Sequence, residues 1–151
     1  MTGIDVPKPA NVLLGEDNED DIELTLEALR GSRVRMEVHV VSDGISAIKF
    51  LHREGEYGDK PRPDLLLLDL NLPLMDGREV LREIRKDPNL TDIPVVVLTT
   101  SEAEEDIIKA YKLHANCYIS KPVDFLKFTE IIKQIDGFWL QLVKLPSRVG
   151  I

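Results

Sequence analysis

Polar side chains that can take part in chemistry stand at the ends of four short apolar runs of this 151-residue chain. They are Glu16, Asp17, Asp69, Asn71, Thr99 and Lys121. Two or three carboxylates a few ångströms apart repel one another by about 1 kcal/mol per pair even in bulk water, so such a group favours a bound cation. Because the ligands are oxygens without a neighbouring His or Cys, the pattern selects Mg²⁺, which also binds water and phosphate oxygens.

Lys121 and Thr99 extend this pattern toward phosphate chemistry. A lysine supplies a point charge for a phosphoryl group, and a threonine hydroxyl supplies a hydrogen bond to it. Taken singly, each residue is better explained by a common structural role, such as a loop acid, a turn residue at a strand end or a solvated lysine. Their joint position at the ends of predicted strands favours phosphoryl transfer as the chemistry of this site.

Five short apolar runs alternate with five segments of helical periodicity. The runs cover residues 12–14, 38–41, 65–68, 95–98 and 118–119. Because these runs are apolar throughout, they predict strands that are buried on both faces of a sheet. Right-handed crossovers then predict an α/β fold with a doubly wound, five-stranded parallel sheet and five helices. Its ligand crevice lies at the carboxyl ends of the strands, where the polar residues stand.

Polar side chains also mark the helical segments. Ser101 and Glu104 have the spacing of a capping box before the fourth segment, and Asp124 is placed to cap the fifth. The first segment carries acids from Glu19 to Glu27 without a base. We expect these acids to form a solvated helix face, with favourable charges at the helix N-terminus.

Composition excludes several classes of function. The chain has 27 acidic and 19 basic residues and a net charge of -8, which repels nucleic acid and anionic membranes. Its single cysteine, Cys117, cannot form an internal disulfide or a zinc cage. No window approaches the roughly 18 apolar residues of a membrane span, and the N-terminus does not have the pattern of a signal peptide. We therefore expect a cytoplasmic protein that binds neither nucleic acid directly nor membrane.

The chemically interesting residues belong to four motifs. The motifs are Leu-Leu-Gly-Glu16-Asp17-Asn18, Leu-Leu-Asp69-Leu-Asn71-Leu-Pro73-Leu-Met-Asp76-Gly77, Val-Leu-Thr99-Thr100-Ser and Tyr118-Ile-Ser-Lys121-Pro122. With these motifs in this order, residues 10–136 resemble the receiver domain of two-component response regulators. The resemblance implies the flavodoxin-like strand order 2-1-3-4-5 and a histidine kinase as the phosphoryl donor.

The same resemblance implies the roles of individual residues. Asp69 is the phosphoacceptor, Lys121 pairs with the phosphoryl group, and Thr99 forms the switch together with Tyr118. The implied Mg²⁺ ligands are Glu16, Asp17, Asp69 and the carbonyl of Asn71. The family also leads us to expect a cis peptide bond between Lys121 and Pro122.

The end of the chain has a narrower resemblance. Phe138-Trp139-Leu140 followed by Leu145-Pro146 is similar to the tail of stand-alone regulators partnered with bacterial and cyanobacterial phytochrome kinases. An apolar stripe with a spacing of about 3.5 residues continues past Gly137, where no obvious core remains to be covered. This stripe predicts a homodimer seam or a kinase-docking face with Trp139 as its anchor, and packing of the aromatic residues on their own subunit is the alternative.

These patterns divide the chain into three parts. They are an N-terminal segment at 1–9, the receiver domain at 10–136 and a tail at 137–151 that contacts a second copy or a partner. Two positions depart from the usual family residues, namely Gly15 in the first strand and Thr100 beside the site. A glycine weakens a strand, and Thr100 either narrows access to the phosphoryl group or has no effect.

Two other functions use similar residues. A Mg²⁺-dependent aspartyl phosphatase also has a nucleophilic Asp after an apolar strand, but it needs a second acid two residues later, where this chain has Asn71. A non-phosphorylated interaction module on the same scaffold usually lacks one of the acids or the lysine, and here all of them are present. Phosphorylation on Asp69 is the better interpretation.

Overall fold

Five parallel strands in the order β2-β1-β3-β4-β5 form the centre of the fold, as the sequence predicted. We describe residues 8–100 and 103–141 of the computed structural model. The strands are β1 (Ala10–Gly15), β2 (Met36–Val41), β3 (Leu65–Leu68), β4 (Val95–Thr99) and β5 (Cys117–Ser120). Each predicted apolar run lies within one of these strands, so the alternation of runs and helical segments was sufficient to locate them.

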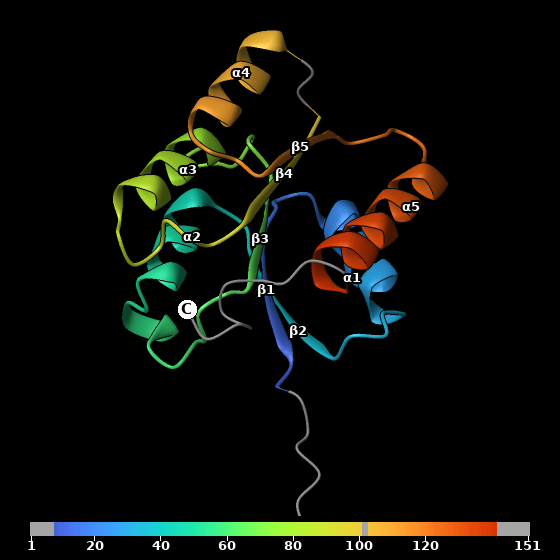
Figure 1. The fold of residues 1–151 in the computed structure, drawn as a ribbon, viewed down its shortest axis with the longest axis horizontal. Helices are drawn as coiled ribbons and strands as arrows, with labels where there is room; N and C mark the ends of the chain where they lie inside the picture. The colour runs from blue at the N-terminus through green and yellow to red at the C-terminus, as the bar shows by residue number, and fades with distance from the viewer. Residues whose placement is uncertain (1–7, 101–102, 142–151) are drawn as a thin grey trace, which may run out of the picture.

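Helices cover both faces of the sheet (Figure 1). α1 (Glu19–Arg30) and α5 (Phe125–Ile135) lie on one face, and α2 (Gly44–Leu51), α3 (Gly77–Lys86) and α4 (Glu104–Lys112) lie on the other. A 3-10 helix, η1 (Gly55–Tyr57), follows α2, and a π-helical turn, η2 (Asp136–Leu140), continues α5. Within the described ranges, no helix has the length and apolar content that a membrane span requires.

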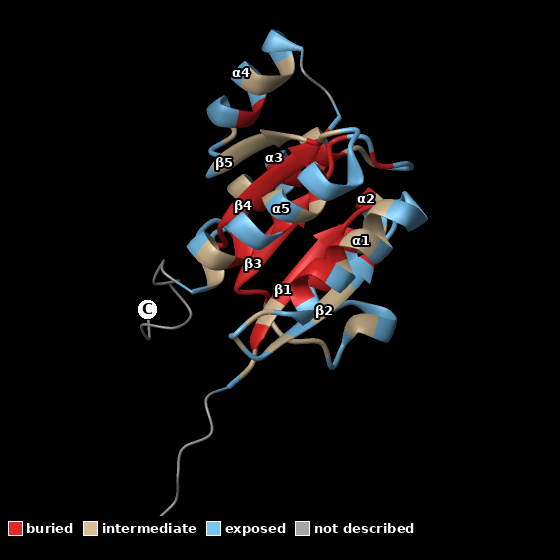
Figure 2. Ribbon diagram, turned by 90° about the vertical axis from the view of Figure 1, so that its right-hand side faces the viewer, coloured by how far each residue is buried: buried red, intermediate tan, exposed pale blue. Residues whose placement is uncertain are grey.

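The central strands are buried on both faces, which explains their continuous apolar sequence (Figure 2). Leu66 and Leu68 of β3 pack in the cluster with α2 and α3, whereas Leu67 packs in the cluster with α1 and α5. Complete burial of a leucine stabilises the fold by about 1.5–3 kcal/mol. The edge strands β2 and β5 are less buried. The most buried strands are therefore β1, β3 and β4, which lead to Glu16, Asp69 and Thr99.

Side-chain caps mark the starts of four helices. The capping residues are Asn18, Asp43, Asp76 and Asp124. The predicted cap at Asp124 is thereby confirmed. The predicted capping box is wrong, because α4 begins at Glu104 itself and the residue before it, Ala103, makes no side-chain cap bond. Ser101, the other member of that box, lies outside the described residues.

Residues 136–140, which continue α5, pack onto their own subunit. Trp139 and Leu140 pack against the cluster that α1 and α5 form with the sheet, so the expectation that no core remains to be covered there is wrong. Asp136 is buried and accepts a hydrogen bond from Ser32 Oγ at 2.7 Å, which ties the end of this helix to the loop after α1. The rest of the predicted stripe, at 142–151, lies outside the described residues.

Candidate functional site

The carboxyl ends of β1 and β3 bring three carboxylates together. Oxygens of Glu16, Asp17 and Asp69 lie within 4.8 Å of one another, with Glu16 and Asp69 buried and Asp17 exposed. The Asp69 N–H donates to the carbonyl of Gly15 at 3.0 Å, so the pairing of β1 with β3 continues up to the site. The repulsion expected from the sequence is present in the folded protein, and this set of oxygen donors fits a hard divalent cation.

The loop after β3 holds Asp69 in one orientation. Asp69 Oδ1 accepts the backbone N–H of Asn71 at 3.0 Å. Gly77, the first residue of α3, donates its N–H to the carbonyl of Leu70 at 2.8 Å. A Cβ at Gly77 would lie 2.4 Å from the carbonyl oxygen of Asp69, so only glycine permits α3 to begin this close to the phosphoacceptor candidate.

Lys121 places its ammonium among the carboxylates. The side chain is 4% exposed, and Nζ contacts Glu16 Oε1, Asp21 Oδ2 at 3.0 Å and Asp69 Oδ2 at 3.0 Å. The backbone N–H of Lys121 donates to the carbonyl of Thr99 at 2.7 Å. The pairing of β4 with β5 therefore delivers the lysine to the acidic cluster, as the strand-end argument predicted.

The charged groups of this cluster have displaced pKa values. Burial raises the pKa of Glu16 to about 7, although the Lys121 ammonium acts in the opposite direction. Burial also acts to raise the pKa of Asp69, but the hydrogen bond from the Asn71 N–H and the charge of Lys121 outweigh it, so this pKa lies below its usual value. Burial acts to lower the pKa of Lys121, but the bonds to Glu16 and Asp69 outweigh it and the pKa is raised. Asp69 is therefore ionised at neutral pH, as a nucleophile must be.

Thr99 and Tyr118 share one face of the sheet. Thr99 is buried at the end of β4, its hydroxyl oxygen lies 3.3 Å from Asn71 Nδ2, and its side chain helps to lower the pKa of Asp69 through a hydrogen bond. Tyr118 pairs in register with Val97 and packs against the core cluster on the side of α2, α3 and α4. The structure thus brings Thr99 to Asp69 and places Tyr118 on the neighbouring strand.

An ion pair connects α3 to α4 on that same face. Arg78 Nε lies 2.9 Å from Asp106 Oδ1, and Nη2 lies 2.7 Å from Asp106 Oδ2. Ala110 is the one buried residue among those of α4 that the structure describes. The packing of α4 is therefore shallow, and this bidentate ion pair links it to α3.

The sequence also led to expectations about the peptide bond before Pro122, about Gly15 and about Thr100. The bond between Lys121 and Pro122 is trans, so the expected cis bond is wrong; trans is the intrinsically favoured isomer by about 0.5–1 kcal/mol. Gly15 remains within β1, where a Cβ would lie 3.2 Å from a Leu68 methyl group. Thr100 is exposed, with its hydroxyl oxygen 3.4 Å from Asn71 Nδ2.

Asp21 is a residue of the site that the sequence did not identify. The prediction of a solvated helix face holds for Asp20, Glu23 and Glu27, which are exposed. It is wrong for Asp21, because α1 begins next to the end of β1 and its first turn lies over the acidic cluster, within 3.0 Å of Lys121. The available signal was the position of Asp21 in the first turn of a helix that begins just after Glu16 and Asp17.

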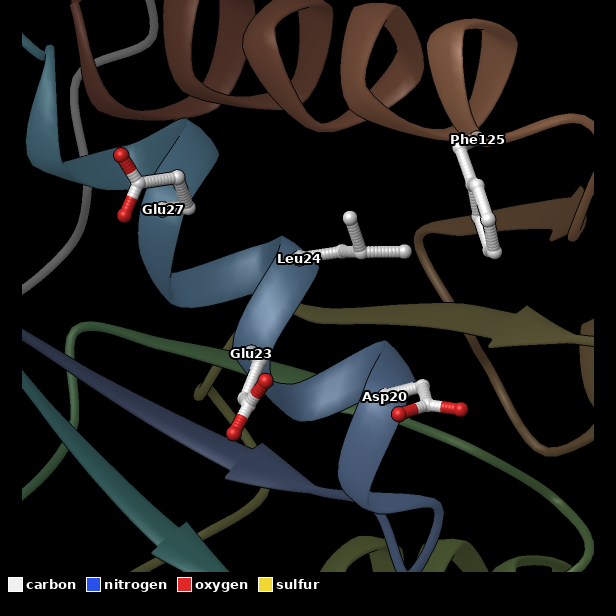
Figure 3. A pocket seen from close by; sticks show the side chains of 5 residues that line it. All are labelled: Asp20, Glu23, Leu24, Glu27 and Phe125. Atoms are coloured by element: carbon white, nitrogen blue, oxygen red, sulfur yellow. The ribbon is translucent and has the colours of Figure 1, made fainter.

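A groove with acidic sides lies between α1 and the start of α5 (Figure 3). Its lining residues are Asp20, Glu23, Leu24, Glu27 and Phe125, and its volume is about 370 Å³. Leu24 points from α1 toward Phe125. Phe125 and Leu126 are largely exposed, as is Val123 just before them. Asp20 of this groove directly precedes Asp21, which contacts Lys121. The groove, with its apolar and acidic side chains, therefore lies beside the acidic cluster.

Comparison with known proteins assigns the family. Residues 12–133 match the response regulator receiver domain, so the chain belongs to the response regulator receiver family. It is 48% identical over 139 residues to response regulator Rcp1 of Synechocystis sp., covering 92% of this chain and 95% of that protein. The fold and the family inferred from the four motifs are confirmed.

Solved structures of similar sequence include regulators of phytochrome signalling. The phosphorylated cyanobacterial phytochrome response regulator RcpA is 52% identical with a TM-score of 0.90, covering 92% of this chain and 99% of that one. The Mn²⁺-bound form of Rcp1 is 48% identical with a TM-score of 0.89, covering 91% and 99%. The bacteriophytochrome response regulator AtBRR is 41% identical with a TM-score of 0.71, covering 91% and 100%. The chain is therefore a receiver of the kind found among phytochrome response regulators.

Proposed function

We propose that this chain accepts a phosphoryl group from a histidine kinase on Asp69 and changes its partner surface in response. The observation that carries the proposal is the Asp69 carboxylate, which is ionised, bonded to the Asn71 N–H and 3.0 Å from the Lys121 ammonium. An Asp69 oxygen attacks the phosphorus, the P–N bond of the phosphohistidine breaks, and the imidazole leaves with the electron pair and takes up a proton.

A divalent cation belongs to this proposal. We assign it to Glu16, Asp17 and Asp69, whose oxygens lie together, and to the carbonyl of Asn71. Mg²⁺ is the expected ion, and Mn²⁺ is bound in the crystal structure of the related Rcp1. When bound, the ion neutralises negative charge on the phosphoryl oxygens. Lys121 supplies a second positive charge, and the Thr99 hydroxyl supplies a hydrogen bond.

Asp17→Ala is expected to remove most of the stabilisation that Mg²⁺ confers. A bound ligand stabilises a protein by about 2.7 kcal/mol at 100 times its Kd, and loss of a carboxylate ligand raises that Kd. Because Asp17 is exposed, the metal-free variant should melt close to the wild type. Thermal denaturation with and without Mg²⁺ checks this, with Asp20→Ala as the control for loss of a nearby acid. Equal thermal shifts in the wild type and Asp17→Ala place the metal elsewhere.

The response to phosphorylation is assigned to Thr99 and Tyr118. In this proposal the Thr99 hydroxyl follows the phosphoryl group, and Tyr118 fills the space that this movement opens. Their position on one face of the sheet supports the assignment. The next helix after Thr99 in the chain is α4, whose ion pair between Asp106 and Arg78 must accommodate the movement. The surface that changes is therefore that of α4 and β5.

A phytochrome-type histidine kinase is the proposed donor. The similar proteins RcpA and AtBRR, which are phytochrome regulators, support this choice. The groove between α1 and α5 supplies a docking surface, because exposed Phe125 can pack on an apolar helix while the acids of α1 attract basic residues. We assign this activity to residues 10–136 and place it in the cytoplasm. We expect no direct nucleic acid binding, because the chain carries a net charge of -8.

Incubation with a small phosphodonor and Mg²⁺ tests the function without the kinase. Intact-mass measurement should find one phosphoryl adduct on the wild type. An aspartyl phosphatase would instead turn over external phosphate esters, and the amide of Asn71 stands where its second acid is required. A non-phosphorylated interaction module would do neither. Absence of both adduct and phosphodonor consumption contradicts the proposal.

We also propose that the tail contributes to a homodimer, with Phe138 as the contact residue. Phe138 is 53% exposed and stands edge-on to Trp139, with ring centroids 5.6 Å apart. The two rings border a groove that includes Cys117 and Ile119 of the edge strand β5. This apolar surface is available to a second copy of the chain, whereas Trp139, the anchor expected from the sequence, packs on its own core.

Phe138→Ala and Trp139→Ala should therefore have different effects. Phe138→Ala is expected to convert a dimer to a monomer in sedimentation experiments, with the melting temperature of the fold nearly unchanged. Trp139→Ala is expected to lower the unfolding free energy by about 2 kcal/mol, since a partly buried aromatic contact is lost, and Tm by roughly 4–8 °C. An unchanged mass for Phe138→Ala contradicts the dimer contact, and an unchanged Tm for Trp139→Ala contradicts its packing role.

A further inference from the structure

The Lys121 ammonium donates hydrogen bonds to three carboxylates in the described part of the chain. A lysine ammonium carries three N–H groups, and the acceptors are Glu16, Asp21 and Asp69. Glu16 and Asp69 also belong to the cluster whose oxygens lie within 4.8 Å of one another, together with Asp17. Asp21 is not part of that cluster. A cation bound by Glu16, Asp17 and Asp69 would therefore leave Asp21 as the one of these three partners of Lys121 that does not bind the cation.

Asp21 is held in place by the first turn of α1. Its backbone N–H donates to Asn18 Oδ1 at 2.9 Å, which is the helix N-cap bond. Its carbonyl accepts the hydroxyl of buried Thr25 at 2.7 Å. The side chain is 23% exposed, so its charge is only partly screened by water. Asp21 thus presents a fixed negative charge toward a long side chain that has many rotamers of its own.

We propose that Asp21 is the positioning residue for Lys121 during phosphoryl transfer. The inference rests on the function proposed above. When a divalent cation draws on Glu16, Asp17 and Asp69, the lysine loses part of its bonding to Glu16 and Asp69 and keeps Asp21. The carboxylate of Asp21 then holds the ammonium beside Asp69, where the incoming phosphoryl group needs it. Asp21 touches neither the phosphoryl group nor the cation in this arrangement.

The effect of removing Asp21 should appear in the transfer rate and not in metal binding. With the lysine less well placed, the initial rate of phosphorylation by a small phosphodonor at saturating Mg²⁺ is expected to fall about tenfold, the range of one charge-assisted hydrogen bond. The Kd for Mg²⁺ alone is expected to change by less than about threefold, because Asp21 is not a ligand. A lower phosphorylation rate with an unchanged Kd for Mg²⁺ is the result expected if Asp21 acts through Lys121.

The experiment compares Asp21→Ala and the isosteric Asp21→Asn with Glu19→Gln. Glu19 is an exposed acid on the same first turn of α1 and does not line the groove between α1 and α5. No bond from it to Lys121 is present in the described ranges, so it controls for loss of charge. A small phosphodonor keeps kinase docking out of the measurement. The measurements are the initial rate of adduct formation, the Mg²⁺ affinity by calorimetry, and the NMR signal of the Lys121 ammonium in the Mg²⁺-loaded protein.

The inference is supported if both Asp21 variants show slow transfer and a mobile Lys121 signal, while Mg²⁺ affinity is retained and Glu19→Gln resembles the wild type. Full transfer rates in the Asp21 variants overturn the inference, as does a Mg²⁺ affinity that falls in parallel with the rate, since that result makes Asp21 a ligand. Should Asp21→Ala not fold, Asp21→Asn decides. If the wild type forms no adduct, the proposed function is contradicted instead. The NMR signal of the Lys121 ammonium, compared between the wild type and the Asp21 variants, then tests the positioning role independently.

Discussion

Asp69→Asn is expected to abolish phosphorylation while leaving the fold intact. An amide oxygen is a far weaker nucleophile than a carboxylate, so the phosphorylated adduct should be lost completely. The substitution removes one of three mutually close negative charges, and Lys121 keeps its bonds to Glu16 and Asp21. The lost contact with Lys121 opposes this relief of repulsion, so we expect the unfolding free energy in the absence of metal to change by no more than about 1 kcal/mol.

Intact-mass spectrometry after incubation with a small phosphodonor and Mg²⁺ measures this loss. Asp59→Asn is a suitable control, because Asp59 is an exposed aspartate just after η1 and should leave the adduct unchanged. Thermal denaturation of both variants checks that the fold is retained. An adduct on Asp69→Asn equal to that of the wild type would show that another residue is the phosphoacceptor.

Gly44→Ala is expected to be the most damaging small substitution near the site. A Cβ at Gly44 would lie 1.7 Å from the carbonyl oxygen of Met75 and 2.6 Å from its carbonyl carbon. Both atoms are backbone and cannot rotate away, so the start of α2 must separate from the loop that follows Asp69. Overpacking of a well-packed region costs about 1–3 kcal/mol, and a backbone clash belongs at the upper end. The expected loss of about 3 kcal/mol corresponds to roughly 6–12 °C in Tm.

Displacement of that loop should also weaken the site itself. Gly44 donates its N–H to the carbonyl of Pro73 at 3.2 Å, within the segment between Asp69 and α3, so Mg²⁺ affinity and phosphorylation rate should fall together with stability. Gly31→Ala is the matched control, because nothing lies within 4 Å of its Cβ position and its φ of -83° is normal for alanine. Equal melting temperatures for the two variants would contradict the steric argument.

The sequence by itself determined the fold, the family and most of the chemical site. Apolar runs between helical segments specify which stretches are buried on two faces, and this local information predicts a doubly wound parallel sheet. The strand order followed from the resemblance to the receiver family. In a parallel sheet all strands end at the same edge, so residues that follow strands must converge. For that reason Glu16, Asp69 and Lys121 could be grouped without any knowledge of distances, and the structure places them in contact.

The tertiary structure alone decided which neighbouring elements touch. Asp21 and Trp139 look like members of a solvated face and a free stripe in the sequence, yet one reaches Lys121 and the other packs under the sheet. The contact between Gly44 and Met75 has no local signature either. Periodicity records which side of an element is buried, but the angle and offset at which α1, α5 and the loop after β3 pack depend on side chains distant in the chain. Close packing of all of them together sets those distances, to within the width of a methyl group.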